Sequence, residues 1–156
     1  MDVFFMIFSI QPFSWLNILC VIFAGAIIGL ERQMQGKPIG IRTSILITLA
    51  TYAFMVLARC SSSAVTDDAR IVGQIIAGIG FLGAGVILAR DGVVTGVTSA
   101  SVIWVLAAIG ITIGLGYGFV GVKLSIMAVL IIVFIEHSEK CFRSLQKGVH
   151  QKKKTN

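Results

Sequence analysis

Charged residues are scarce in this chain of 156 residues, and acidic residues are the scarcest. Only 13% of the residues are Asp, Glu, Lys or Arg, whereas a soluble domain averages about 25%. Hydrophobic residues make up 56% of the chain, which excludes a disordered protein. The three cysteines are too few for a disulfide scaffold. The composition also argues against an ordinary cytosolic enzyme and indicates a protein that has the lipid bilayer as its solvent.

Five apolar stretches come close to the length of about 20 residues that a membrane-spanning helix needs. They lack the alternation of polar and apolar residues that a membrane β-barrel requires. We therefore expect an all-α, polytopic helical bundle of about five spans, and the short second span should extend by a few residues at either end. The predicted spans are residues 14–30, 43–58, 71–89, 97–114 and 119–135. They form a transmembrane domain over residues 1–135, which a short basic tail follows at 136–156.

The positions of Lys and Arg predict how the bundle is oriented, because cationic loops are retained in the cytoplasm. With the N-terminus outside, ten of the 13 cationic residues lie in the inner loops and the tail. Only Arg59 and Arg70 then lie outside, and Lys123 falls within the fifth span. We therefore predict an N-out/C-in topology. The net charge of +6 reflects this topology, and no nucleic-acid partner is expected.

Small residues recur at helical spacing within the spans. They let helix backbones approach closely, and in lipid such packing replaces much of the hydrophobic effect. Three of them also spell G-x-G-x-x-G, but that motif indicates nucleotide binding only between a strand and a helix, and here it lies within an apolar span. We predict that the following residues pack helices together: Gly25, Gly29, Gly73, Gly78, Gly80, Gly83, Gly85, Ala100 and Ala107.

The most informative charges lie where the first span meets the following loop. Glu31 ends an apolar helix, where a carboxylate is partly desolvated and requires a cation. Arg32, Lys37 and Arg42 lie on the same side of the membrane. One interpretation is an ordinary cytoplasmic loop that follows the positive-inside rule. Because the chain has only seven carboxylates, the other is a functional group of charges formed by Glu31, Arg32 and Arg42.

On the outer side, Asp67, Asp68 and Arg70 precede the third span. Asp67 is well placed to cap that helix, because its carboxylate accepts from the unpaired N–H groups and complements the helix dipole. Asp67 and Asp68 are also the weak metal candidates of the chain, as the mouth of a Mg²⁺ site built from oxygen ligands. Two exposed carboxylates would bind this ion weakly, so capping is the favoured role.

Polar residues within the spans are few, and none at mid-membrane is acidic. Gln74, Thr98 and Ser99 are candidates for hydrogen bonds between helices. A cation pathway or a proton relay normally contains buried carboxylates, so their absence from the sequence here argues against a self-sufficient pathway. In the tail, Glu136 and Lys140 are spaced for an i,i+4 ion pair, which predicts a helix along the anionic inner leaflet.

Several of these residues form one pattern. The run GIGFLGAGVI occupies residues 78–87, after Asp67, Arg70 and Gln74, and a segment from Gly96 to Gly110 follows it. Glu31 with Arg32, and GIRT at 40–43, complete the pattern. Over about residues 15–135 the chain resembles the MgtC/SapB family of bacterial inner-membrane proteins. It departs from the family at Asp68, where Pro is usual, and at Ser99, which replaces Thr. It also ends after a short tail, without the ACT-like domain of longer members, so the functions of that domain do not transfer.

The resemblance implies a multi-pass protein of the bacterial inner membrane that is linked to Mg²⁺ homeostasis and, in pathogens, to survival inside host cells. One hypothesis is a non-enzymatic modulator of other membrane proteins, for which the family suggests the F-type ATP synthase or a Mg²⁺ transporter. The alternative is a transporter or channel for Mg²⁺ or another cation, which acts as an oligomer with Asp67 and Glu31 at opposite mouths. The surplus of small-residue faces predicts a homodimer. No cofactor is expected, and Mg²⁺ would be a ligand or a transported ion.

Overall fold

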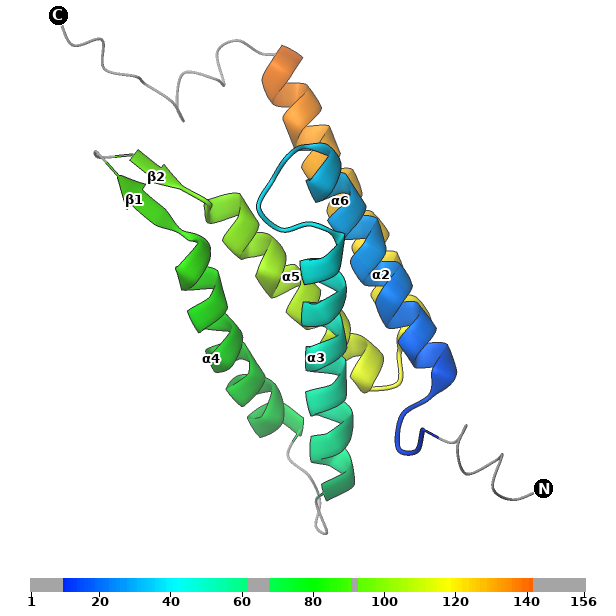
Figure 1. Ribbon diagram of the computed structural model, residues 1–156. Helices are drawn as coiled ribbons and strands as arrows, with labels where there is room; N and C mark the ends of the chain where they lie inside the picture. The colour runs from blue at the N-terminus through cyan, green and yellow to red at the C-terminus, as the bar shows by residue number, and fades with distance from the viewer. Residues whose placement is uncertain (1–9, 62–67, 91–92, 142–156) are drawn as a thin grey trace, which may run out of the picture.

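The computed structural model of the chain describes residues 10–61, 68–90 and 93–141. Five of its helices are long and apolar enough to cross a membrane. This confirms the predicted all-α polytopic bundle (Figure 1). The elements are α2 (Trp15–Met34), α3 (Ile41–Ser61), α4 (Asp68–Val86), β1 (Leu88–Arg90), β2 (Val93–Thr95), α5 (Val97–Gly114) and α6 (Gly118–Cys141).

The helices follow the predicted apolar stretches, and a short β-hairpin that was not predicted lies between α4 and α5. Helix α5 coincides with the predicted fourth span, and α3 is longer than the predicted second span at both ends, as expected. The third span differs because α4 ends at Val86 and the chain then forms an antiparallel hairpin of β1 and β2. Strand β2 consists of β-branched residues, and Asp-Gly at 91–92 is a strong hairpin signal. Hydropathy alone does not separate such strands from the end of an apolar helix.

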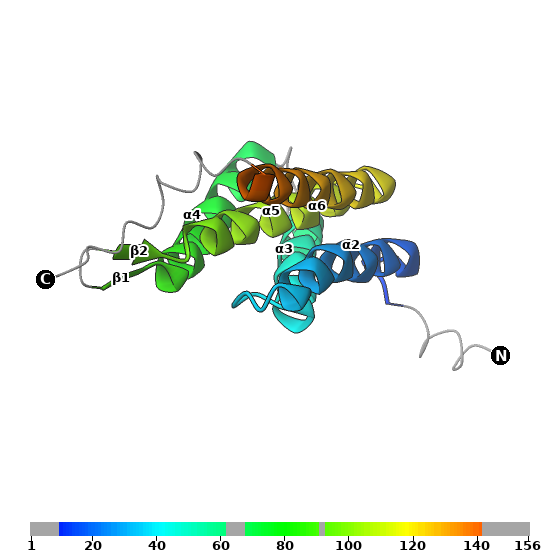
Figure 2. The same cartoon turned by 90° about the horizontal axis from the view of Figure 1, so that it is seen from above.

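Helix α5 is the centre of the bundle and contacts each of the other four helices. Helix α2 packs against α3 and α6, and Figures 1 and 2 show α2 and α6 running alongside each other. Helix α4 packs mainly on α5 and stands at the edge of the bundle, diverging from α3 towards the end that carries the hairpin (Figure 1). The core is aliphatic, and its most deeply buried members include Val21, Ile28, Leu106, Ile109 and Ile113.

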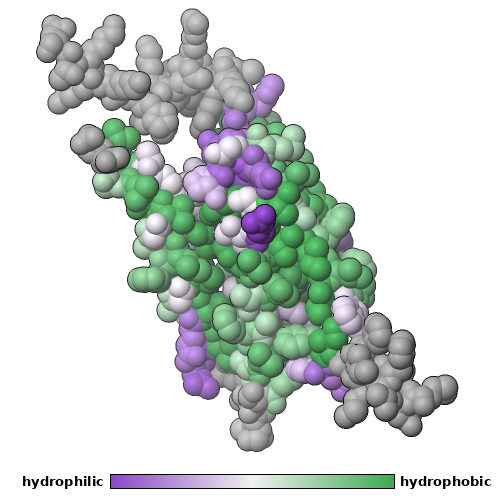
Figure 3. Space-filling model, viewed as in Figure 1, coloured by the Kyte–Doolittle hydropathy of each residue, from purple (hydrophilic) through white to green (hydrophobic). Residues whose placement is uncertain are grey.

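The surface of the bundle is that of a protein in lipid. Many large apolar side chains are exposed around it, among them Phe81, Leu130 and Phe134. Figure 3 shows a mostly hydrophobic surface over the middle of the molecule, with hydrophilic residues towards its two ends. In a bilayer these apolar side chains contact acyl chains, so their exposure in the isolated chain carries no penalty.

Two pairs of glycines set how closely the central helices approach each other. A Cβ atom on Gly25 or Gly29 of α2 would lie 2.8 or 2.5 Å from a backbone Cα atom of α3. A Cβ atom on Gly110 or Gly114 of α5 would likewise meet α3, at 1.9 and 2.7 Å from its nearest atoms. The backbones of α2 and α3 therefore touch directly, while α5 packs closely on side chains and carbonyls of α3, and only glycine permits these approaches.

Gly36, Gly96 and Gly116 have positive φ angles, and Gly96 is the one at which a side chain would also collide with the backbone. Gly96 precedes α5 with φ of +89°, and a Cβ atom there would lie 2.1 Å from the carbonyl oxygen of Val86. The chain thus turns sharply from the hairpin into α5. This turn places the first residues of α5 beside the end of α2, where the charged residues of that helix lie.

Candidate functional site

A buried arginine is the most unusual residue of the bundle. Arg32 lies in the last turn of α2 and is only 1% exposed. Its Nη2 donates a hydrogen bond to Oγ of Ser99, in the first turn of α5, at 2.6 Å. Ser99 is itself buried. A buried guanidinium is costly unless it is paired and hydrogen-bonded, so the groups around Arg32 decide whether the site is stable.

Two carboxylates provide the opposite charge. Glu31 and Glu136 both interact electrostatically with Arg32. The Gln35 side chain, one turn after Glu31, donates a hydrogen bond from Nε2 to a carboxylate oxygen of Glu136. Glu136 belongs to α6, so the group joins the ends of three helices. We call Glu31, Arg32, Gln35, Ser99 and Glu136 the polar cluster.

The polar cluster is not fully hydrogen-bonded within the part of the chain that the structure describes. Both carboxylate oxygens of Glu31 are shielded from solvent and accept no hydrogen bond of good geometry from those residues. Nε of Arg32 is likewise buried without an acceptor among them. Two carboxylates around one guanidinium leave the polar cluster with an excess of negative charge, which the nearby ammonium of Lys37 offsets in part.

The polar cluster differs in membership from the group predicted from the sequence. Arg42 is exposed in the first turn of α3, and no hydrogen bond or ion pair joins it to the cluster among the described residues. Gln35 and Glu136 were not predicted to belong to it. Gln35 could have been identified from the sequence, because it follows Glu31 by four residues and so lies on the same face of the helix. Glu136 was expected to pair with Lys140, whose side chain lies outside the described residues, and only the fold brings Glu136 to α2.

The opposite end of the bundle offers a weaker site. Asp67 lies outside the described residues. Asp68 begins α4, and one of its carboxylate oxygens lies 3.5 Å from Nε of Arg59, at the end of α3. Both side chains are partly exposed, so this ion pair is worth less than about 1 kcal/mol. Arg70 is exposed in the first turn of α4. Among the described residues, no three His, Cys, Asp or Glu side chains come together as a metal site.

The predicted packing residues fall into two groups on α4. Gly80 and Gly83 face α5, because a Cβ atom on either would meet the indole of Trp104, at 3.9 and 3.4 Å. Ala100 and Ala107 of α5 are buried in the bundle. In contrast, a Cβ atom on Gly73, Gly78 or Gly85 would meet no atom of the described residues within 4 Å.

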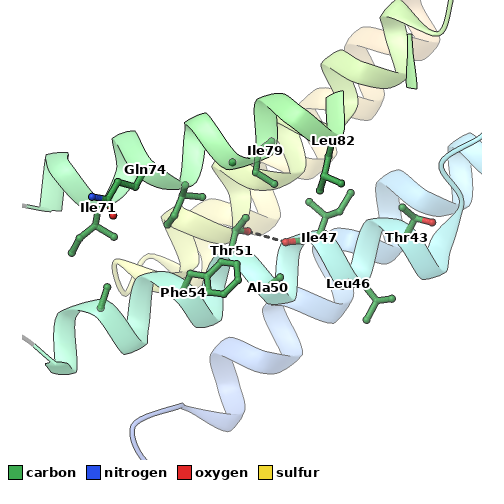
Figure 4. Close-up of a pocket in the computed structure, with 13 residues that line it drawn as sticks. Thr43, Leu46, Ile47, Ala50, Thr51, Phe54, Ile71, Gln74, Ile79 and Leu82 are labelled. Carbon is green, nitrogen blue, oxygen red and sulfur yellow. Dashed lines mark hydrogen bonds between the residues drawn. The ribbon is translucent and has the colours of Figure 1, made fainter. Parts of the chain in front are cut away.

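A lipid-facing groove lies between α3 and α4. It has a volume of about 750 Å³ and is mostly apolar. Gln74 of α4 lines it, together with Thr43 and Thr51 of α3 (Figure 4). Thr98, in contrast, is exposed at the start of α5 and does not line the groove. The other lining residues are Leu46, Ile47, Ala50, Phe54, Ala58, Ile71, Ile75, Gly78, Ile79 and Leu82.

The polar side chains between the helices form no path across the bundle in the described residues. The hydroxyl of Thr48 donates to the carbonyl of Ser44, and that of Thr51 donates to Ile47 and Thr48. Ser125 likewise donates to its own helix, at Val122. These hydroxyls satisfy backbone carbonyls one turn back and present no row of carboxylates.

Comparison with known proteins gives the same assignment for most of the chain. A family model described as the MgtC family matches residues 18–141. "Putative magnesium transporter YhiD" of Escherichia coli strain K12 is 39% identical over 140 residues, which cover 85% of this chain and 64% of that protein. "Protein MgtC" of Salmonella typhimurium strain LT2 is 40% identical over 101 residues, which cover 65% of this chain and 43% of that protein.

An "Uncharacterized protein" of Haemophilus influenzae is 39% identical over 137 residues, which cover 82% of this chain and 55% of that protein. The chain therefore spans less than two thirds of the length of these relatives. No solved structure matches it. The match of the family model over residues 18–141, which include the polar cluster and all but the first three residues of the five spanning helices, shows that this chain belongs to the MgtC family.

Proposed function

We propose that this chain is a non-enzymatic protein of the bacterial inner membrane that takes part in Mg²⁺ homeostasis by acting on other membrane proteins. The link to magnesium rests on the name of the YhiD relative and on membership of the MgtC family. The mode of action rests on the bundle itself. A modulator needs exposed surfaces that a partner can bind, whereas a transporter needs a polar route through its helices.

The absence of a polar route among the described residues carries the proposal. The hydroxyls of Thr48, Thr51 and Ser125 between the helices donate to carbonyls of their own helix, and the buried Ser44 hydroxyl has no partner among the described residues. The buried charges gather at one end of the bundle, in the polar cluster, and Arg32 is already held there by Ser99. Moving a hydrated divalent cation past this interior would expose it to hydrocarbon without ligands, which is prohibitively costly.

The contact surface that we propose for the partner is the loop between α2 and α3. Lys37 is exposed in this loop and Arg42 is exposed in the first turn of α3 directly after it, whereas Arg32 is buried. With the predicted topology this loop faces the cytoplasm, where it can meet acidic surfaces of another membrane protein. Family resemblance suggests the F-type ATP synthase or a Mg²⁺ transporter as that partner. The charges of the polar cluster then serve to fix the loop, since they tie the end of α2 to α5 and α6.

A flux experiment tests the proposal against the transporter alternative. The purified full chain is reconstituted into liposomes that contain a Mg²⁺-sensitive dye, and a Mg²⁺ gradient is applied with and without a membrane potential. We expect the rate of Mg²⁺ entry to equal that of empty liposomes. A reconstituted Mg²⁺ channel serves as the positive control. Entry that rises with the amount of protein, and falls when Glu31 is replaced by Gln, would overturn the proposal in favour of a cation transporter.

A second experiment tests the contact surface. A photo-reactive amino acid replaces Arg42 in cells grown at low Mg²⁺, and cross-linked products are purified from the membrane. We expect a membrane protein of Mg²⁺ transport or energy coupling, and we expect Lys37→Glu to reduce its yield. The matched control places the same photo-reactive residue at Leu130, which is exposed on the lipid-facing side of α6. Equal yields from both positions would contradict the loop as the contact.

A further inference from the structure

A single unpaired amide marks the free face of α4. Gln74 lies six residues into α4, about 9 Å along the axis from its first residue. Its side chain lines the groove beside α3 and makes no hydrogen bond with any described residue (Figure 4). Gln74 is exposed, and α4 is long and apolar enough to cross a membrane, so acyl chains beside it would offer the amide no partner. A primary amide left in that position is costly unless another protein group reaches it.

Glycines accompany Gln74 on the same face. At 100° per residue, Gly78, Phe81 and Gly85 all lie within about 40° of Gln74 around the helix axis. A Cβ atom on Gly78 or Gly85 would meet nothing within 4 Å, and Phe81 is 83% exposed. Glycine within a helix costs about 1 kcal/mol relative to Ala, and no described residue needs the space that these two glycines leave. The opposite face of α4, with Gly83, is the one that packs on Trp104.

We propose that this face of α4 binds the same face of a second copy of the chain. We call Gln74, Gly78, Phe81 and Gly85 the α4 face. Copies of one membrane protein insert in the same orientation, so a two-fold axis along the membrane normal brings each residue opposite its own counterpart at equal depth. An amide has both a donor and an acceptor, so two Gln74 side chains satisfy each other. An unrelated helix would need a polar group at that same depth.

Gly78 and Phe81 complete the contact between the two copies. Gly78 is one turn from Gln74, so two α4 backbones can approach closely enough for the amides to meet. Phe81, which the isolated chain leaves almost fully exposed, then packs against the partner copy. The proposal rests on the proposed function, because it makes a dimer the unit that meets other membrane proteins. It uses a different surface, since the α2–α3 loop remains free in the dimer.

Energy transfer between labelled copies in liposomes tests the dimer. Cys60 is exposed at the end of α3, and a Cys141→Ser background leaves it and the buried Cys20 as the cysteines of the chain. The purified full chain carries donor or acceptor dyes on Cys60, and lipid is added to dilute it within the bilayer. We expect dilution-dependent transfer. Gln74→Leu should raise the dissociation constant about tenfold, and Gly78→Leu should remove the transfer at every dilution.

Matched controls separate the interface from the fold. Ser101→Ala removes another lipid-exposed polar group, which donates to the carbonyl of Val97, and should leave the dissociation constant unchanged. Gly78→Leu should keep the helical content, because its side chain enters open space in the single chain. The proposal is overturned if transfer does not depend on dilution, or if Gln74→Leu and Gly78→Leu both leave the dissociation constant unchanged.

A photo-reactive residue at Gly85 identifies the occupant in cell membranes. We expect a product with the mass of two copies, whereas products with lipid or with another protein alone would overturn the second copy as the occupant. The outcomes are independent of those for the proposed function. A monomer that transports no Mg²⁺ would contradict the dimer only, and a dimer that transports Mg²⁺ would contradict the proposed function only.

Discussion

Arg32 shows how a charge can be kept inside a membrane protein. The guanidinium is removed from water, but it has Ser99 as an acceptor and two carboxylates near it. Replacing a buried ion pair by apolar residues is often neutral, whereas removing one partner leaves the other charge without compensation. Arg32 is the only cation in the polar cluster itself. The loss of Arg32 should therefore destabilise the cluster more than the loss of the Ser99 hydroxyl.

We predict that Arg32→Met lowers the free energy of unfolding by about 3 kcal/mol, because Glu31 and Glu136 then repel each other without a guanidinium beside them. Ser99→Ala removes one hydrogen bond to a charged group and should cost about 2 kcal/mol. Arg42→Met is the matched control, because this exposed residue has no described partner and should change stability by less than about 0.5 kcal/mol. Unfolding in mixed micelles, followed by circular dichroism, gives the three values. Equal stability of the Arg32 and Arg42 variants would show that the burial of Arg32 has no energetic consequence.

At the level of elements, glycine serves two purposes in this bundle. On α2 and α5 it lets the backbones of neighbouring helices touch, as the short distances from Gly29 and Gly110 to α3 show. On α4, a Cβ atom on Gly73, Gly78 or Gly85 would have no neighbour within 4 Å in the part of the chain that the structure describes. The glycines of α2 and α5 are needed for the helices of one chain to pack, and we propose that Gly78 and Gly85 pack two copies of the chain together. Substitution by alanine distinguishes the two, because it adds one methyl group in either setting.

We predict that Gly29→Ala destabilises the bundle by about 1 to 3 kcal/mol, because its methyl group would overlap the Cα atom of Ile41 and push α2 away from α3. Gly73→Ala adds the same methyl group where nothing lies within 4 Å, and should be neutral or stabilising by up to about 1 kcal/mol. Thermal unfolding of both variants in detergent checks the difference. A Gly29 variant as stable as the Gly73 variant would contradict the close approach of α2 and α3.

The sequence alone predicts some of these features and not others, for physical reasons. Apolar length predicts the spans, because every backbone polar group in lipid must be satisfied within its own helix. Spacing predicts that Gly29 and Gly78 belong to packing faces. It does not distinguish a glycine that packs within the chain from one on an open face, because the spacing is the same for both. Only the rotation of each helix in the bundle shows that Gly29 meets α3 and that Gly78 meets nothing. Glu136 joins the polar cluster through contacts that are distant in sequence, so no local pattern reveals it.

Successive helices run in opposite directions, so the loops alternate between the two ends of the molecule (Figure 1). One end of the bundle carries the β1–β2 hairpin, the loop between α2 and α3, and the end of α6 (Figure 1). The start of α2 lies at the other end. The polar cluster belongs to the first end, since Arg32 and Glu136 come from the last turns of α2 and α6. Because Lys37, Arg42 and Arg90 lie at that end, the positive-inside rule predicts that it faces the cytoplasm. The cluster and the exposed Arg42 then face the same compartment.

We predict that a membrane-impermeant maleimide labels Cys60 in intact spheroplasts of a Cys141→Ser variant, because α3 ends on the outer side in the N-out/C-in topology. Pro38→Cys in a chain that also carries Cys60→Ser places the thiol in the exposed α2–α3 loop, and it should be labelled only after the membrane is permeabilised. The buried Cys20 is an internal control that should stay unlabelled in both cases. Labelling of Pro38→Cys in intact spheroplasts, with protection of Cys60, would invert the topology. The loop with Arg42 would then face away from the cytoplasm, and a cytoplasmic contact at that surface would be ruled out.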